Sequence, residues 1–149
     1  MSLESQIQQD LKDAMIAKDK VALASVRGIK AAILLAKTSE GATGEITDAD
    51  IVKLIQKLVK QRKESAEIYS QQNRQELADN ELAEIKVLEK YLPKQMSESE
   101  VEAALKQIIA QVGATSAADM GKVMGTATKA LAGRADGKII SAIVKRLLA

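Results

Sequence analysis

The sequence predicts an all-α protein, and three observations support that prediction. Apolar residues recur at three- and four-residue spacing along nearly the whole chain, which is the period of an amphipathic helix. No segment shows the sustained two-residue alternation that is typical of a half-buried strand. Of the 149 residues 46% are hydrophobic but only two are aromatic, so aliphatic side chains must form the core.

The first two predicted helices precede a polar loop. Leu3, Ile7 and Leu11 recur at helical spacing in the first helix. Asp19 is placed to cap the second helix, because its carboxylate can accept hydrogen bonds from the free backbone amides of a first turn. This second helix ends before residues 38–44, a polar segment that contains two glycines.

Two further helices follow and end at the only proline. Thr47 begins the third helix, and Asn73 with Glu76 has the spacing of a capping box that begins the fourth. Pro93 ends the fourth helix, because proline disfavours helical geometry in the residue before it. The predicted buried stripes contain Ile51, Leu54, Ile55, Leu58, Val59, Arg62, Ala66, Tyr69, Leu77, Leu82, Ile85, Leu88, Tyr91 and Leu92.

Three short helices are predicted after Pro93. Gly113 and Gly133 are placed to end the first two of them, because glycine readily adopts the left-handed geometry found just past a helix. We therefore expect two domains, a four-helix bundle over residues 1–92 and a three-helix module over residues 93–149. The second is near the lower size limit for an independent core. The predicted N-terminal caps are Ser97 with Glu100, Ser116 with Asp119, and Asp136.

The residue types that are missing exclude much enzyme chemistry. The chain has no Cys and no His, so it offers no disulfide, thiolate nucleophile or imidazole acid–base, and none of their metal sites. We expect no cofactor and no metal. No basic N-terminal segment leads into an apolar run, and no apolar stretch reaches about 18 residues. These features predict a cytoplasmic protein without a membrane partner.

The charge of the chain is unevenly distributed. Residues 1–92 carry a net charge of −1, whereas residues 120–149 hold six basic residues and one acidic residue. Such asymmetry indicates an anionic partner, although a solvated helix face is the ordinary alternative. A second basic cluster at residues 60–63 adjoins Glu64 and Glu67, which favours an ordinary charged helix face there. The candidates for anion binding are Lys122, Lys129, Arg134, Lys138, Lys145 and Arg146.

Two features of this basic segment leave alternatives open. Gly121 and Gly125 lie inside a predicted helix, where each costs about 1 kcal/mol relative to Ala. Close packing of another helix would explain them, and so would close approach of a phosphate or backbone group. Arg134 and Lys138 flank the start of the last helix, where free amides favour an anion. The alternative there is an Asp136 cap with a local Arg134 ion pair.

Five segments carry a resemblance to a known family: VRGIK at 26–30, KQRKES at 60–65, EIKVLEKYLP at 84–93, ADMGKVMG at 118–125 and GRADGK at 133–138. With these segments in this order the chain resembles the YqeY family, also called GatB/YqeY-domain proteins. The resemblance implies an all-helical protein similar to the tail of the B subunit of the glutamine-dependent aspartyl/glutamyl-tRNA amidotransferase, which helps to hold tRNA. It also implies that Lys122, Arg134 and Lys138 bind RNA. The glycines that would shape this surface are Gly121, Gly125, Gly133 and Gly137.

These observations predict a tRNA-associated accessory protein whose basic C-terminal patch binds folded RNA. With only Tyr69 and Tyr91, the chain lacks the rings on which single-strand RNA readers stack bases. The family's carbon–nitrogen ligase label, with glutamine as nitrogen donor, is expected to be inherited, because no residues replace the missing thiol route to ammonia. The alternative is a helical adaptor that docks onto an aminoacyl-tRNA synthetase or amidotransferase without contacting RNA.

Overall fold

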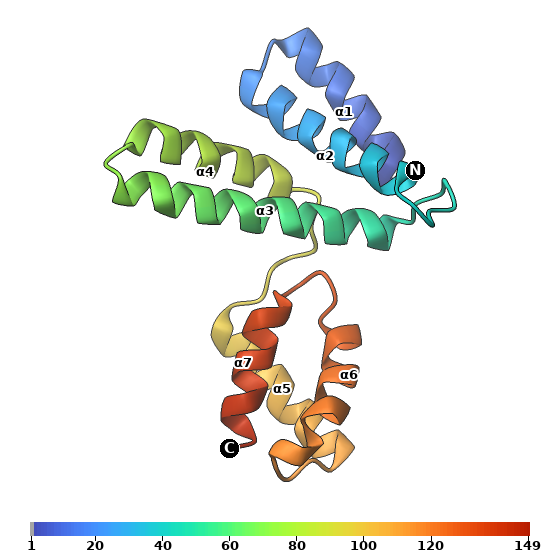
Figure 1. Cartoon of the computed structure of the whole chain (residues 1–149), viewed down its shortest axis with the longest axis vertical. Helices are drawn as coiled ribbons and strands as arrows, with labels where there is room; N and C mark the ends of the chain where they lie inside the picture. Colours follow the sequence, from blue (N-terminus) through green and yellow to red (C-terminus); the bar gives the residue numbers. More distant parts are fainter. Residues whose placement is uncertain (1) are drawn as a thin grey trace. The chain divides into compact units, whose positions relative to one another are not determined.

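The computed structural model describes residues 2–149, and its regular structure in that range is entirely helical (Figure 1). This confirms the all-α prediction. The chain divides into two compact units, one that ends at Leu92 and one formed by Pro93–Ala149. No helix within residues 2–149 is long and apolar enough to cross a membrane. The elements are α1 Leu3–Ala17, α2 Lys20–Thr38, α3 Asp48–Gln71, α4 Gln75–Glu89, α5 Glu98–Val112, the 3-10 helix η1 Ala117–Asp119, α6 Met120–Ala130 and α7 Gly137–Leu147.

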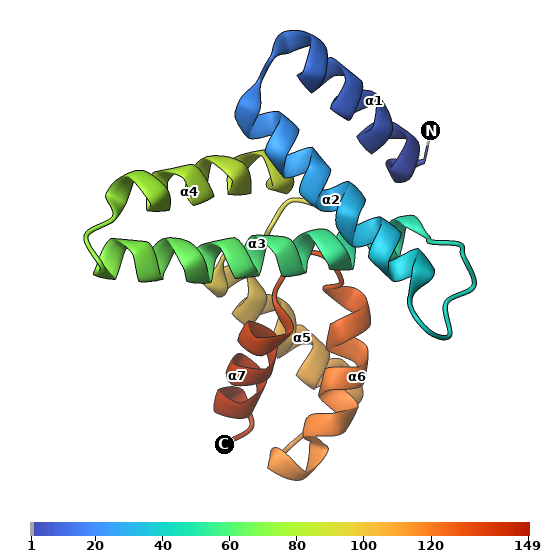
Figure 2. The same cartoon turned by 45° about the horizontal axis from the view of Figure 1, so that its top comes forward.

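The N-terminal unit is built from two helix pairs, α1 with α2 and α3 with α4 (Figures 1 and 2). Polar side chains cap the starts of three of these helices. Ser2 caps α1, and Asp19 accepts a hydrogen bond from the Ala22 amide at 3.1 Å at the start of α2. Thr47 and Asp50 form a reciprocal capping box at the start of α3. These bonds satisfy amides that have no partner inside their own helix, so the predicted starts of α2 and α3 are confirmed.

The apolar faces of the four helices meet in one core. α2 packs against α1, α3 and α4, so it holds the two helix pairs together. The core is made almost entirely of branched aliphatic side chains, each of which contributes about 1.5–3 kcal/mol when fully buried. Its buried members are Ile7, Val26, Ile29, Ile33, Ile51, Ile55, Val59, Ile85 and Leu88.

The start of α4 differs from the predicted one. Asn73 has a φ of 58°, a left-handed conformation that turns the chain between α3 and α4. Arg74 occupies the N-cap position and makes no side-chain cap bond. The predicted capping box of Asn73 with Glu76 is therefore wrong, because Asn tolerates left-handed geometry as well as it caps helices. Leu82, which was expected to face the core, is 45% exposed.

A half-buried ion pair joins α3 to α4 beneath α2. The Arg62 guanidinium lies 3.6 Å from the Glu84 carboxylate, and only 18% and 19% of these side chains are exposed. Gly28 of α2 leaves room for the guanidinium, because a Cβ there would lie 3.1 Å from Arg62 Nη2. The three residues come from three of the segments that carry the family resemblance. Arg62 therefore has a packing role, which agrees with its place in the predicted buried stripe and sets it apart from the charged helix face expected for the cluster at residues 60–63.

A hydrogen bond ties the end of the N-terminal unit back to α1. The Tyr91 hydroxyl donates to the Asp10 carboxylate at 2.5 Å. Burial raises the pKa of Tyr91, and the hydrogen bond to Asp10 and its charge raise it further, so the hydroxyl remains a donor at physiological pH. Tyr69 is also half-buried. Neither ring therefore stands fully exposed as a platform for a base.

The C-terminal unit packs α5, α6 and α7 around a second core. Ser97 and Glu100 form the predicted capping box at the start of α5, and Gly113 ends that helix with a φ of 71°. Asp136 accepts a hydrogen bond from the Lys138 amide at 2.9 Å and caps α7 as predicted. The buried members of this core are Val101, Leu105, Ile108, Val123, Ala127, Leu131, Ile140, Ile143, Val144 and Leu148.

Candidate functional site

The exposed face of α6 combines glycines with basic side chains. Lys122 and Lys129 are seven residues apart, so two helical turns separate them by about 10 Å along the axis. Between them the surface forms a broad, open hollow of about 640 Å³. Thr126 and Ala130, to which no pattern in the sequence points, complete its lining. The lining residues are Gly121, Lys122, Gly125, Thr126, Lys129 and Ala130.

Nothing in residues 2–149 packs against the two glycines of this hollow. A Cβ added to Gly121 or Gly125 would meet no heavy atom of a neighbouring element within 4 Å. Of the two explanations left open by the sequence, close helix packing therefore does not apply within the described chain. The glycines leave the backbone of α6 bare, so a partner can approach it more closely than a side chain would allow.

Replacing both glycines by alanine is expected to stabilise the C-terminal unit. Gly121→Ala with Gly125→Ala should raise its free energy of unfolding by about 1–2 kcal/mol, because Ala favours the helix and neither methyl group meets a neighbour. Hydrogen exchange of the α5–α7 amides measures this change. Gly113→Ala is the control: its φ of 71° strains any side chain, so that variant should be less stable. A double variant less stable than the parent would contradict the expectation.

Asp119 lies at the start of α6, and its carboxylate already accepts hydrogen bonds from backbone amides of its own chain. Its carboxylate accepts hydrogen bonds from the Thr115 amide at 2.9 Å and the Ser116 amide at 3.4 Å. The helix predicted from Ser116 is thus divided into η1 and α6. These backbone bonds, and to a smaller degree the Lys122 charge, hold the pKa of Asp119 below its usual range. The carboxylate therefore stays ionised and offsets part of the Lys122 charge.

The start of α7 is capped by its own side chain. Because the Asp136 carboxylate already accepts the Lys138 amide, fewer free donors remain for an external anion. The Lys138 side chain itself is exposed, and Gly137 leaves the first turn bare. The predicted alternative was an Asp136 cap with an Arg134 ion pair. The cap is present, but Arg134 takes part in none of the ion pairs of residues 2–149.

Arg134 helps to join the segment before α5 to the turn before α7. Its Nε donates to the Lys94 carbonyl at 3.3 Å, and its own carbonyl accepts a bond from the Met96 amide at 2.9 Å. Gln95 Nε2 donates to the Gly133 carbonyl at 2.8 Å. The segment before α5 is thereby tied to the turn before α7. Arg134 is half-buried, so changing it would disturb this turn as well as any anion site.

The end of α7 carries one paired cation and one unpaired cation. An Arg146 Nη lies 3.3 Å from the Glu102 carboxylate of α5, and Lys106 approaches the same carboxylate at 3.5 Å. The bond to Arg146 and its charge lower the pKa of Glu102, with a smaller contribution from Lys106. Lys145 is exposed and takes part in none of the ion pairs of the described chain.

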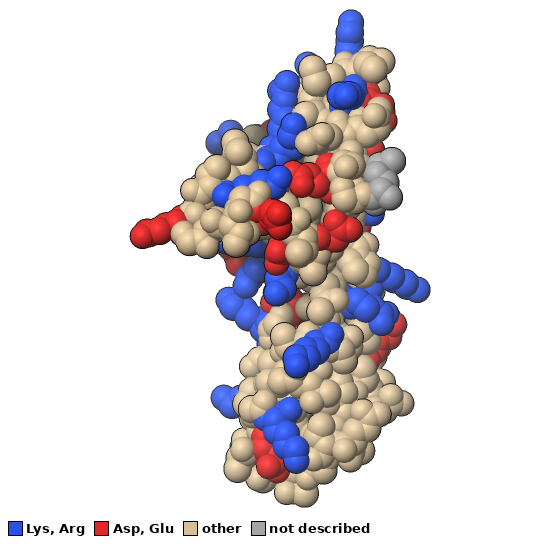
Figure 3. Space-filling model, turned by 90° about the vertical axis from the view of Figure 1, so that its right-hand side faces the viewer, with Lys and Arg blue, Asp and Glu red and all other residues tan. Residues whose placement is uncertain are grey.

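Four of the six predicted basic residues thus remain exposed and unpaired within residues 2–149, and we call them the free lysines. On the face drawn in Figure 3, basic groups of the unit that contains α5–α7 stand apart on a mainly uncharged surface. Two lysines lie on α6 and two on α7, each pair seven residues apart. Separated cations on a bare surface are suited to a polyanion. The free lysines are Lys122, Lys129, Lys138 and Lys145.

Comparison with known proteins finds relatives that match nearly the whole chain. A family model described as Yqey-like protein matches residues 4–148. A curated relative from Pyrenophora tritici-repentis, named Altered inheritance of mitochondria protein 41, mitochondrial, is 34% identical over 149 residues, which cover 95% of this chain and 78% of the relative. Proteins of the same name from Clavispora lusitaniae and Lachancea thermotolerans are 37% and 31% identical. These matches cover 61% and 71% of this chain but only 52% and 57% of those relatives.

The names of these relatives overturn one expectation. The sequence predicted a cytoplasmic protein, whereas the three relatives are named as mitochondrial proteins. The prediction of a cytoplasmic location is therefore wrong on this finding. The prediction rested on the absence of a hydrophobic signal or membrane segment, and that absence does not distinguish between these compartments.

Proposed function

This chain belongs to the YqeY family, and from that premise we propose that it binds folded RNA, with tRNA as the first candidate, through the free lysines of α6 and α7. The single observation that carries the proposal is the hollow on α6, where Lys122 and Lys129 stand beside two exposed glycines that nothing in the described chain covers. Cations beside a bare backbone favour a ligand that is anionic and closely fitted, as a sugar–phosphate backbone is.

The proposed contacts are with the RNA backbone. Lys ammonium groups neutralise phosphates, and the Thr126 hydroxyl in the hollow is suited to a phosphate oxygen or a 2′-hydroxyl. Because Tyr69 and Tyr91 are half-buried, recognition by base stacking is not expected. The protein would therefore recognise the shape of a folded RNA. We also infer, from the sequence resemblance, that its RNA is held in the company of a tRNA amidotransferase or synthetase, without catalysis by this chain.

Reversing two charges on α6 should weaken tRNA binding and should also make that binding less dependent on salt. If the four free lysines each neutralise one phosphate, log K should fall with log salt at a slope of about −3.6. The Lys122→Glu, Lys129→Glu variant should bind at least about tenfold more weakly, with a slope near half that value. Titrations of tRNA at several salt concentrations measure both quantities.

A matched control makes the same change of charge in the other unit. Lys12 and Lys20 are exposed and take part in none of the ion pairs of residues 2–149, so Lys12→Glu with Lys20→Glu should leave the slope nearly unchanged. If the α6 variant binds tRNA as tightly as the parent does, the proposal fails. We avoid Arg134 in this test because its Nε is bonded to the Lys94 carbonyl.

One observation favours the adaptor as a second candidate. Ile16 of α1 is 82% exposed and Leu35 of α2 is 71% exposed, the highest values among the large hydrophobic side chains of residues 2–149. Large exposed aliphatic side chains are suited to contact with another protein. Affinity capture of the chain from a nuclease-treated lysate distinguishes the two candidates. A synthetase or amidotransferase retained after nuclease favours the adaptor, and one lost with the RNA favours RNA binding.

A further inference from the structure

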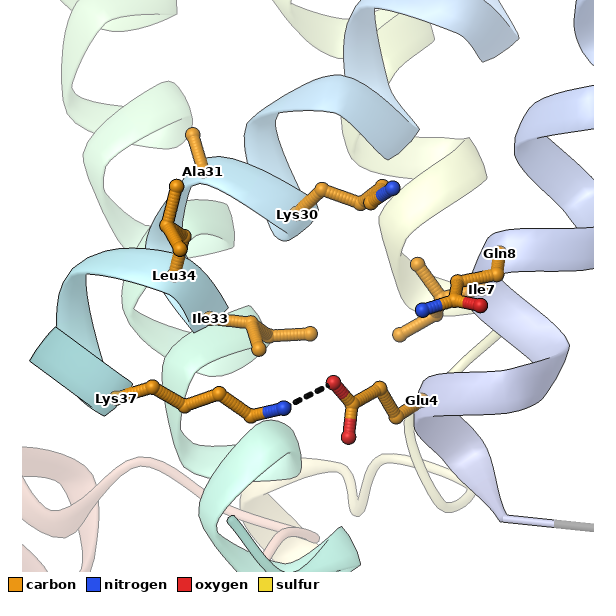
Figure 4. A pocket seen from close by; sticks show the side chains of 8 residues that line it. All are labelled: Glu4, Ile7, Gln8, Lys30, Ala31, Ile33, Leu34 and Lys37. Atoms are coloured by element: carbon orange, nitrogen blue, oxygen red, sulfur yellow. Dashed lines mark hydrogen bonds and ion pairs between the residues drawn. The ribbon is translucent and has the colours of Figure 1, made fainter. Parts of the chain in front are cut away.

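A second cavity lies between α1 and α2 of the N-terminal unit, and the proposed RNA interface does not use it (Figure 4). Its volume is about 360 Å³, which is within the usual range for small-ligand sites. Ile7 of α1 and Ile33 of α2 form its middle, and Leu34 of α2 borders it (Figure 4). The lining is mainly apolar, so it favours a hydrocarbon group.

Polar side chains stand at the two ends of this cavity. Lys30 and Gln8 lie at one end, and Lys37 forms an ion pair with Glu4 at the other (Figure 4). Two of these long polar side chains come from α1 and two from α2, so they stand along the seam between the two helices. Lys30 and Gln8 are exposed and keep their polar ends in water, whereas Ile7 and Ile33 beneath them are almost fully buried.

Lys30 is the unneutralised charge of the site. Lys37 is neutralised by Glu4, whereas Lys30 is exposed and takes part in none of the ion pairs of residues 2–149. It also belongs to the VRGIK segment, in which Gly28 has a packing role beside Arg62. A single cation at the edge of an apolar cavity is complementary to one anionic group attached to an apolar tail.

We propose that this cavity binds a small amphiphilic monocarboxylate. Its tail lies against Ile7, Ile33 and Leu34, and its carboxylate pairs with Lys30 at the water-exposed end. A volume of 360 Å³ equals about twelve water molecules at ~30 Å³ each, so the cavity is suited to a ligand of about ten non-hydrogen atoms. Octanoate has that size and is the probe for the test.

Titration of octanoate into the full chain, followed through backbone amide shifts by NMR, tests the proposal. Saturable shifts should be confined to α1, α2 and the residues packed on them. Octanol has the same tail without the charge and should bind about threefold more weakly, which is the contribution expected of one exposed ion pair. Acetate has the charge without the tail and should give no saturable shift there.

Four exposed residues supply matched variants. Lys30→Gln should weaken octanoate binding about threefold, whereas Lys20→Gln, on the same helix outside the cavity, should not. Leu34→Gln should weaken it about fivefold, whereas Leu35→Gln, the next residue but not part of the lining, should not.

Glu4→Gln should have the opposite effect. It removes a negative charge from the cavity and releases Lys37, so octanoate should bind about threefold more tightly. A gain of this kind cannot arise from loss of folding. The proposal is overturned if octanol binds the parent as tightly as octanoate, if Lys30→Gln leaves the affinity unchanged, or if the saturable shifts lie away from α1, α2 and the residues packed on them.

Discussion

Leu105→Ala is expected to lower the free energy of unfolding of the C-terminal unit by about 3–4 kcal/mol. Leu105 is 0% exposed and lies in the core of this unit, so the change removes buried methyl groups and leaves a cavity. A unit of this size has a margin of only a few kcal/mol. Most of the folded C-terminal unit should therefore be lost near physiological temperature, and the proposed tRNA binding with it.

The matched variant Leu88→Ala makes the same chemical change in the other core, where Leu88 is equally buried. Native-state hydrogen exchange of the α5–α7 amides and of the α1–α4 amides measures the two units separately. Because the two cores share no residue, each variant should destabilise mainly its own unit. Equal loss of protection in both units from either variant would show that they unfold as one body and would refute the expectation of two domains.

Arg62→Ala is expected to cost about 2 kcal/mol in the free energy of unfolding of the N-terminal unit. The change leaves the half-buried Glu84 without its partner, and breaking a fully buried pair costs about 3–5 kcal/mol. We expect less because both side chains remain partly exposed and because Arg62 Nε, buried without a hydrogen-bond partner, already reduces the net value of the pair. Urea unfolding measures the difference.

Two further conditions separate the charge from the packing. Arg62→Met with Glu84→Gln removes both charges and keeps most of the volume, so it should be more stable than Arg62→Ala.

Burial, followed by the Glu84 charge, raises the pKa of Glu81, and Arg62 opposes that rise. An acid with a raised folded-state pKa contributes stability below its unfolded pKa and loses that contribution as the pH rises through the raised value. The deficit of Arg62→Ala should therefore be smaller at pH 4 than at pH 7, and an equal deficit at both would contradict this account.

Most helix starts could be predicted because a cap is a local structure. Asp19, Thr47, Ser97 and Asp136 each bond to amides within three residues of themselves, so the sequence contains both partners. The prediction of a cap at Asn73 was wrong for a local reason as well. Two local conformations suit this residue, and the chain adopted the left-handed one. Leu82 was misplaced because the helical period leaves the edge of a buried stripe undefined.

The sequence could predict which basic residues the candidate site contains, but not which of them are free to bind a partner. The basic residues after position 120 are evident from the sequence, but two contacts decided which of them are available. Arg134 is bonded across 40 residues to Lys94, and Arg146 is paired with Glu102 of another helix. The bare surface at Gly121 and Gly125 was only one of two alternatives until the neighbours of α6 were known.

The sequence by itself determined that this protein is helical, where most of its helices begin and end, and which segment is basic. These properties depend on the helical period and on bonds between residues close in the chain. Only the tertiary structure decided which lysines are unpaired, that Arg62 lies at a helix junction, and that a cavity remains between α1 and α2. Pairing and packing depend on residues brought together from distant parts of the chain, and no local pattern records those distances.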